Sequence, residues 1–105
     1  MKASELAERI TANSAPTVID ARSAMEFHHG HIPGAIHAPV LKILLKRARL
    51  PEDRKAELVI TCEHGPRALM AKGLLATYGY RTTTLLDGHM LGWRRAGLPL
   101  DEGAR

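Results

Sequence analysis

The residue best suited to covalent chemistry is Cys62, the single cysteine of this 105-residue chain. It follows an apolar, β-branched run at residues 58–61 and opens the segment Cys62-Glu63-His64-Gly65-Pro66-Arg67, after which a helical pattern begins. Converging backbone N–H groups and the positive end of a helix dipole stabilise a thiolate in such a loop. Because the thiolate is the nucleophilic form of cysteine, the sequence predicts a reactive sulfur here.

The alternative is that Cys62 is a small apolar side chain at the end of a core strand, which is the usual fate of a free cysteine. Two neighbours favour reactivity. Gly65 permits the positive φ that a chain needs where it closes around an anion. Arg67 adds a rigid fork of hydrogen-bond donors at the start of the helix. His64 could orient or protonate a substrate, but a solvated loop histidine is the more common case.

Alternating helical and strand-like patterns place this loop at a sheet edge. The order is αβαβαβαβα, with a first helix capped by Ser4 and a third that starts at Pro39 and runs to about Arg49. These patterns indicate an α/β domain with a small, mostly parallel sheet of four to five strands and helices on both faces. Ligands of such sheets bind beyond the carboxyl ends of the strands. We expect strands at residues 17–20, 35–37, 58–61 and 82–86, and further helices at residues 24–29, from residue 66 or 67 to the glycine at 79, and at 89–96.

Length and composition predict one domain over residues 1–105, large enough to bury a core without disulfides or metals. A single cysteine fits a reducing compartment. The first residues lack the apolar segment of a signal peptide, and no apolar run approaches the roughly 18 residues of a membrane span. We therefore expect a cytoplasmic protein that does not associate with membranes.

The net charge of +4 and a pI of 9.6 raise the question of nucleic-acid binding. The most basic stretch, residues 42–54, interleaves its cations with leucines, as on the solvated face of an amphipathic helix, and the chain has only four aromatic residues for base stacking. We expect no nucleic-acid partner. His28, His29 and His31 lie close together but lack a matching set of cysteines or carboxylates, so no metal site is predicted. Asp20 and Arg22, two residues apart, suggest a structural pair.

Five segments, in order from about residue 4 to residue 100, resemble a single-domain rhodanese. They are Val18-Ile19-Asp20-Ala21-Arg22, Glu26-Phe27, Gly30-His31-Ile32-Pro33-Gly34-Ala35-Ile36, the Cys62 loop, and Gly88 to Trp93 with Gly97-Leu98-Pro99. The resemblance implies a rhodanese-like fold without a cofactor, in which Cys62 is catalytic and residues 63–67 bind the substrate. The cysteine would take sulfane sulfur from thiosulfate or a persulfide, hold it as a persulfide, and pass it to a thiophilic acceptor such as a thiol protein.

Loop length separates this reaction from those of phosphatases and arsenate reductases in the superfamily, which resemble a pattern of Cys, five residues and Arg. Here four residues intervene, which favours sulfur over a tetrahedral anion. Glu63 stands where many similar sulfurtransferases carry a basic residue, and Pro66 removes one backbone donor. Arg67 and a protonated His64 could offset the charge of Glu63. We expect modest thiosulfate activity and a preference for a protein or low-molecular-weight persulfide, with a non-turnover sulfur carrier as the alternative.

Overall fold

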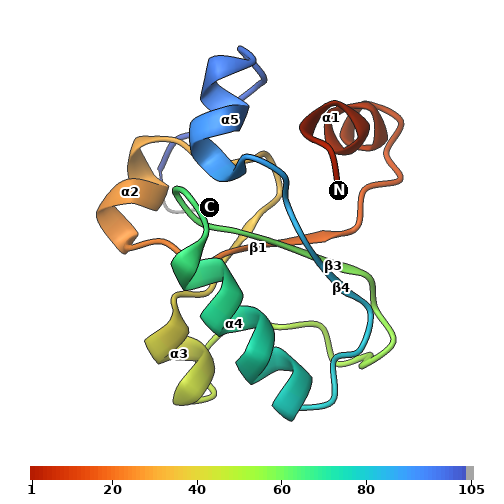
Figure 1. Cartoon of the computed structure of the whole chain (residues 1–105), viewed down its shortest axis with the longest axis vertical. Coiled ribbons are helices and arrows are strands. Elements are labelled where there is room, and N and C mark those ends of the chain that lie inside the picture. Colours follow the sequence, from red (N-terminus) through yellow and green to blue (C-terminus); the bar gives the residue numbers. More distant parts are fainter. Residues whose placement is uncertain (104–105) are drawn as a thin grey trace.

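The computed structural model describes residues 1–103 and has the predicted alternation of helices and strands (Figure 1). All four strands are parallel, in the order β2-β1-β3-β4. The prediction of a small parallel sheet within an α/β fold is confirmed. The elements are α1 (Ala3–Thr11), β1 (Thr17–Asp20), α2 (Ala24–His29), β2 (Ile36–His37), α3 (Val40–Leu44), β3 (Leu58–Thr61), α4 (Pro66–Thr77), β4 (Thr83–Leu85) and α5 (His89–Arg95).

Helices cover both faces of the sheet because side chains alternate along each strand. Ile19 of β1 and Ile60 of β3 point to one face, in a cluster that includes Leu75 of α4, while Val18 and Val59 belong to a cluster on the other face. Helices α3 and α4 pack together on the first side, and α1, α2 and α5 contribute to the second (Figure 1). A sheet covered on both sides explains why β1 and β3 carry apolar residues on both faces.

The central pairing of β1 with β3 brings the candidate site together. Asp20, the last residue of β1, lies opposite Thr61, the last residue of β3. Because the strands are parallel, the segment after Asp20 and the loop after Thr61 leave the sheet at the same edge. The first residues of α5 reach this edge too, since the Met90 N–H donates to the Cys62 carbonyl at 3.0 Å.

Two predicted helix boundaries are wrong. Helix α1 begins at Ala3, so Ser4 lies inside it and does not cap it. Helix α3 ends at Leu44, because Lys46 adopts a left-handed backbone with φ of 57°. Leaving the helix axis at Lys46 lets Ala48 and Leu50 turn back and pack against the cluster beneath α4. This tertiary burial overrides the helical spacing of the basic segment.

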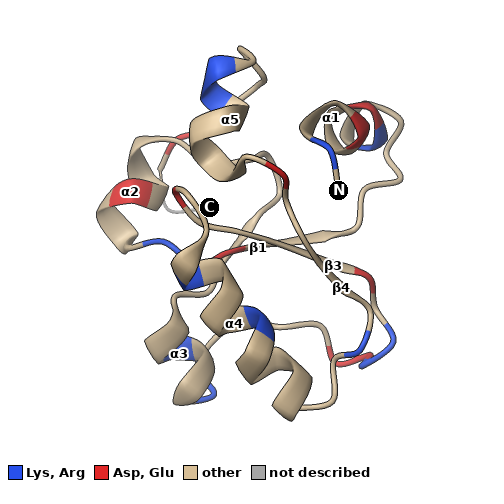
Figure 2. Cartoon of the chain, viewed as in Figure 1, with Lys and Arg blue, Asp and Glu red and all other residues tan. Residues whose placement is uncertain are grey.

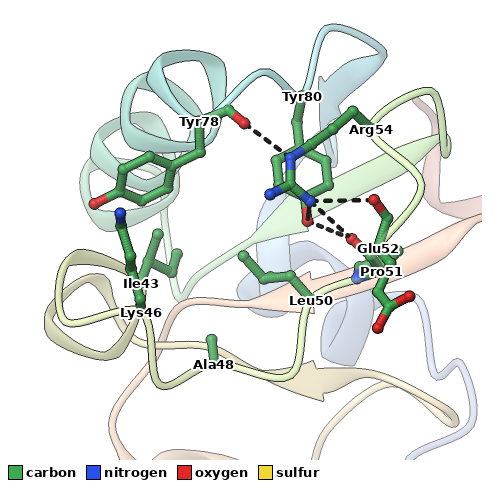
Figure 3. Close-up of a pocket in the computed structure, with 9 residues that line it drawn as sticks. All are labelled: Ile43, Lys46, Ala48, Leu50, Pro51, Glu52, Arg54, Tyr78 and Tyr80. Atoms are coloured by element: carbon green, nitrogen blue, oxygen red, sulfur yellow. Dashed lines mark hydrogen bonds between the residues drawn. The ribbon is translucent and has the colours of Figure 1, made fainter.

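A hollow of about 380 Å³ lies between this segment and the end of α4 (Figure 3). Its wall includes Arg54, which donates to the Tyr78 carbonyl at 2.9 Å and to the Tyr80 hydroxyl at 2.8 Å. Tyr78 follows the last turn of α4, whereas the Cys62 loop precedes its first turn. Twelve helical residues separate the two ends by about 18 Å. The hollow is therefore remote from the cysteine.

Candidate functional site

The Cys62 loop closes tightly over the sulfur. The Gly65 N–H donates to Cys62 Sγ at 3.0 Å, and Gly65 adopts a φ of 133°, in the region that favours glycine. Pro66 is the first residue of α4, where its missing N–H costs no helical hydrogen bond. The loop is anchored from α5, since the Leu91 N–H donates to the Glu63 carbonyl at 3.1 Å. The predicted turn is therefore present, and the Gly65 N–H contacts the sulfur where several converging donors were expected.

Cys62 is also part of the core. Its side chain is fully buried and belongs to the same apolar cluster as Ala68 and Ala71 of α4. The burial expected of a core cysteine is present together with a backbone donor to the sulfur, and the reactivity of Cys62 stays a prediction. The sulfur is shielded from water and receives a backbone donor from the loop.

Arg67 lies at the start of α4, as predicted, but its donors are already engaged. Its two terminal nitrogens contact the two carboxylate oxygens of Glu26 on α2, at 2.6 and 3.0 Å. The Arg67 hydrogen bonds, together with smaller contributions from Ser23, lower the pKa of Glu26 to about 2. The carboxylate is thus ionised and pairs with the guanidinium. The predicted fork is directed at another side chain of the protein.

Glu63 is neutralised by partners other than those predicted. Arg94 of α5 contacts both of its carboxylate oxygens, and Arg22 lies 3.6 Å from one of them. The hydrogen bonds from Arg94, ahead of the charge of Arg22, lower the pKa of Glu63. The expectation that Arg67 and His64 supply the compensating charge is wrong, because Arg67 is held by Glu26 and His64 is exposed.

Asp20 and Arg22 form the expected structural pair. Both are buried, and the guanidinium contacts the carboxylate through two nitrogens, the closest distance being 2.9 Å. Arg22 also donates to the Gly30 carbonyl at 2.7 Å. Around the loop, the three guanidiniums of Arg22, Arg67 and Arg94 therefore face three carboxylates. Figure 2 shows acidic and basic segments close together at α2, the start of α4 and the loop between β3 and α4, with a further basic segment near the end of α5.

A family profile described as the Rhodanese-like domain matches residues 2–96. The chain belongs to this family. A sulfurtransferase of Allochromatium vinosum is 32% identical over 95 residues, which cover 90% of this chain and 87% of that protein. An HTH-type transcriptional regulator of Mycobacterium tuberculosis is 41% identical over 90 residues. Those residues are 84% of this chain but only 38% of the regulator, so the likeness covers a minor part of that protein.

Solved structures agree with the assignment to the rhodanese-like family. A rhodanese-related protein from Thermoplasma volcanium superposes with a TM-score of 0.79 at 28% identity, covering 96% of this chain and 95% of that one. Within residues 1–103, no helix is long and apolar enough to cross a membrane.

The opening beside the loop of this rhodanese-like domain is small and of mixed charge. A depression of about 260 Å³ is lined by Arg22, Glu26, Glu63 and Arg94. An incoming anion meets guanidiniums that already have carboxylate partners. The charges that line this depression are therefore largely balanced within the protein.

His89 was missed as a site residue in the sequence. It is the first residue of α5, and its Nδ1 accepts the backbone N–H of Cys62 at 3.3 Å. The helical pattern of residues 89–96 indicated only that His89 is a polar residue at the start of a helix. The one available signal was its position in the segment that follows the last predicted strand, because the loops after parallel strands lie together at one edge of the sheet.

Proposed function

We propose that this protein is a sulfurtransferase in which Cys62 carries sulfane sulfur as a persulfide. The observation that supports it best is the Gly65 N–H at 3.0 Å from Cys62 Sγ, at the carboxyl end of a parallel strand in a rhodanese-like domain. A backbone donor aimed at sulfur stabilises its anionic forms in the thiolate and in the persulfide. The resemblance to a curated sulfurtransferase supports the same activity.

The reaction proceeds by two displacements at sulfur. The Cys62 thiolate attacks the outer sulfur of the donor, a new S–S bond forms, and the donor's own S–S bond breaks. Thiosulfate would leave as sulfite and a persulfide as its parent thiolate. An acceptor nucleophile then attacks the terminal sulfur of Cys62–S–S⁻ and releases the thiolate. A neutral sulfur atom moves from donor to acceptor, so no cofactor or net oxidant is required.

We assign substrate contact to Glu63, His64, Gly65, Pro66 and Arg67, which form the loop over the sulfur. Because the guanidiniums at the opening are paired with carboxylates, a dianionic donor gains little from them. A persulfide of a small thiol or of a protein carries less charge than thiosulfate. It therefore loses less hydration free energy when it enters the site. We therefore infer that persulfides are better donors than thiosulfate, and that a thiol, free or protein-bound, is the acceptor.

The proposal is tested by intact mass measurement after incubation with thiosulfate and, separately, with a small-molecule persulfide. Wild type should gain one sulfur, about 32 Da, and Cys62→Ser should gain none. The absence of this adduct with every donor would exclude persulfide chemistry at Cys62.

Two further expectations from the sequence stay predictions. They are a cytoplasmic location and a single domain over residues 1–105.

Turnover separates an enzyme from a carrier. Repeated thiocyanate release from thiosulfate and cyanide indicates a sulfurtransferase, whereas one sulfur per chain without further release indicates a carrier. Phosphate release from an aryl phosphate would instead favour the phosphatase alternative, which the four-residue spacing between Cys62 and Arg67 disfavours.

A further inference from the structure

His89 contacts the Cys62 loop from a different element of the fold. Its Nδ1 accepts the Cys62 backbone N–H at 3.3 Å and lies 3.5 Å from Thr61 Oγ1. Its Nε2 lies 3.6 Å from the position that a Cβ on Gly65 would occupy. The imidazole thus extends from the end of β3 to the glycine whose N–H contacts the sulfur. It contacts the start of the turn that holds Cys62 and lies beside Gly65 near its end.

The backbone of His89 is unusual for its residue type. Its φ is 50°, in the left-handed region that favours glycine and asparagine. A histidine at such a position carries backbone strain, and strain of this kind concentrates at functional sites. The contacts of the ring with the Cys62 loop offer a reason for its presence.

The hydrogen bond from Cys62 requires a particular protonation state. An imidazole that accepts at Nδ1 is neutral and carries its proton on Nε2. Burial lowers the pKa of His89, the charge of His64 lowers it further, and Asp87 acts in the opposite direction. The Asp87 carboxylate itself lies 3.6 Å from the Met1 amine. Burial and His64 outweigh Asp87, so the pKa of His89 lies below its usual value of 6.5 and the ring is mainly neutral at pH 7.

We propose that neutral His89 is a positioning residue for sulfur transfer, which holds the Cys62 backbone N–H and thereby keeps the sulfur beneath the Gly65 N–H. Protonation places a second donor opposite the Cys62 N–H, so the bond is lost and the turn relaxes. Sulfur loading of Cys62 therefore falls on acidification as His89 becomes charged. This proposal rests on the proposed function of Cys62, but the contact itself does not depend on it.

A test that needs no activity uses Cys62→Ser, which removes the thiol and keeps the backbone donor. In ¹H–¹⁵N spectra, the amide of position 62 should titrate in step with the His89 ring protons. The titration should vanish in the double variant Cys62→Ser/His89→Asn, and its midpoint should move to higher pH in Cys62→Ser/His64→Asn, because a nearby charge is removed. An amide that does not follow His89 would overturn the proposal even if wild type takes up sulfur.

Two substitutions at His89 then test its effect on the reaction. Asparagine places Oδ1 where Nδ1 lies, tolerates the left-handed backbone and does not titrate. Phenylalanine keeps a ring and the same backbone strain but has no acceptor. At neutral pH His89→Asn should load sulfur at close to the wild-type rate and His89→Phe about 10-fold more slowly, as expected for an unsatisfied N–H. A positioning role would be contradicted if the loading rate of His89→Asn fell at low pH as much as that of wild type. A wild-type loading rate in His89→Phe would also contradict it.

If wild type takes up no sulfur while the amide of position 62 still titrates with His89, the proposed function fails and the contact stands. If sulfur is taken up but the amide is indifferent to His89, the proposed function stands and this inference fails.

Discussion

Arg67 and Glu26, 41 residues apart in the chain, form a two-point ion pair that joins the first turn of α4 to α2. Arg67 was expected to bind an anion, but in this pair it makes a structural contact beside the Cys62 loop. It also fixes the charge of the opening, because a free guanidinium there would attract dianions and a paired one attracts them far less. The contact therefore links α2 to the start of α4, directly after the Cys62 loop.

The first prediction concerns acid stability. The folded-state pKa of Glu26 is about 2, below its ordinary value of 4.5, so its contribution is complete above pH 4.5 and is lost as the pH falls toward 2. Because both side chains are about one-third exposed, the pair is worth about 0.5–1 kcal/mol after screening. Glu26→Gln should lower Tm by about 2–6 °C at pH 7, and the difference should shrink below pH 4. Thermal melts across pH 2.5–7 measure it.

The control for this experiment is Glu8→Gln on α1, an exposed carboxylate far from the loop in sequence. It should leave Tm nearly unchanged. A Glu26→Gln deficit of the same size at pH 7 and pH 2.5 would show that packing, and not charge, is responsible.

The second prediction concerns donor charge. Glu63→Gln removes the carboxylate that faces Arg94 and Arg22, which leaves positive charge beside the loop. At low salt, kcat/KM for thiosulfate should rise about 3- to 10-fold, and the gain should shrink as ionic strength increases. Glu63→Arg should raise it further. Glu52→Gln, which makes the same charge change at the remote hollow, serves as the control. A rise of equal size in both variants would remove this role from Glu63.

The third prediction concerns the turn over the sulfur. Alanine is disfavoured at the φ of 133° that Gly65 adopts, so Gly65→Ala should shift the loop and weaken the N–H contact with Cys62. Sulfur loading should slow about 10-fold or more. The matched control is Gly73→Ala in the exposed middle of α4, where an added Cβ meets no atom within 4 Å. It should raise stability by about 0.5–1 kcal/mol and leave loading unchanged. Equal loading rates in the two variants would contradict the assignment.

The small parallel sheet and the position of Cys62 at a strand end were predictable, because local apolar patterns and the alternation of strands with helices indicate them. The partners of the charged side chains were not. Glu26 and Arg67 meet only when α2 packs beside α4, and Glu63 meets Arg94 only when α5 folds over the loop. The early end of α3 at Leu44 has a similar cause, since burial of Leu50 competes with helical propensity. Sequence spacing carries little information about contacts of this kind.

The last prediction concerns the buried pair that supports the loop from β1. Asp20 is fully buried and Arg22 nearly so, and the arginine also reaches Gly30 and Glu63. Asp20→Asn leaves a buried guanidinium without its nearest counter-charge, which should cost about 3–5 kcal/mol of the free energy of unfolding in urea. Such a loss is a large part of the about 5–15 kcal/mol that stabilises a domain.

The double variant Asp20→Asn/Arg22→Met tests the cause of that loss. Removal of the unpaired charge should restore part of the stability, so the two substitutions should be far from additive. Sulfur loading should not recover with it, because Glu63 then lacks one of its two arginines and the balance of charge at the opening changes. An Asp20→Asn variant within about 1 kcal/mol of wild type would mean that water reaches the guanidinium and that the pair does not support the loop.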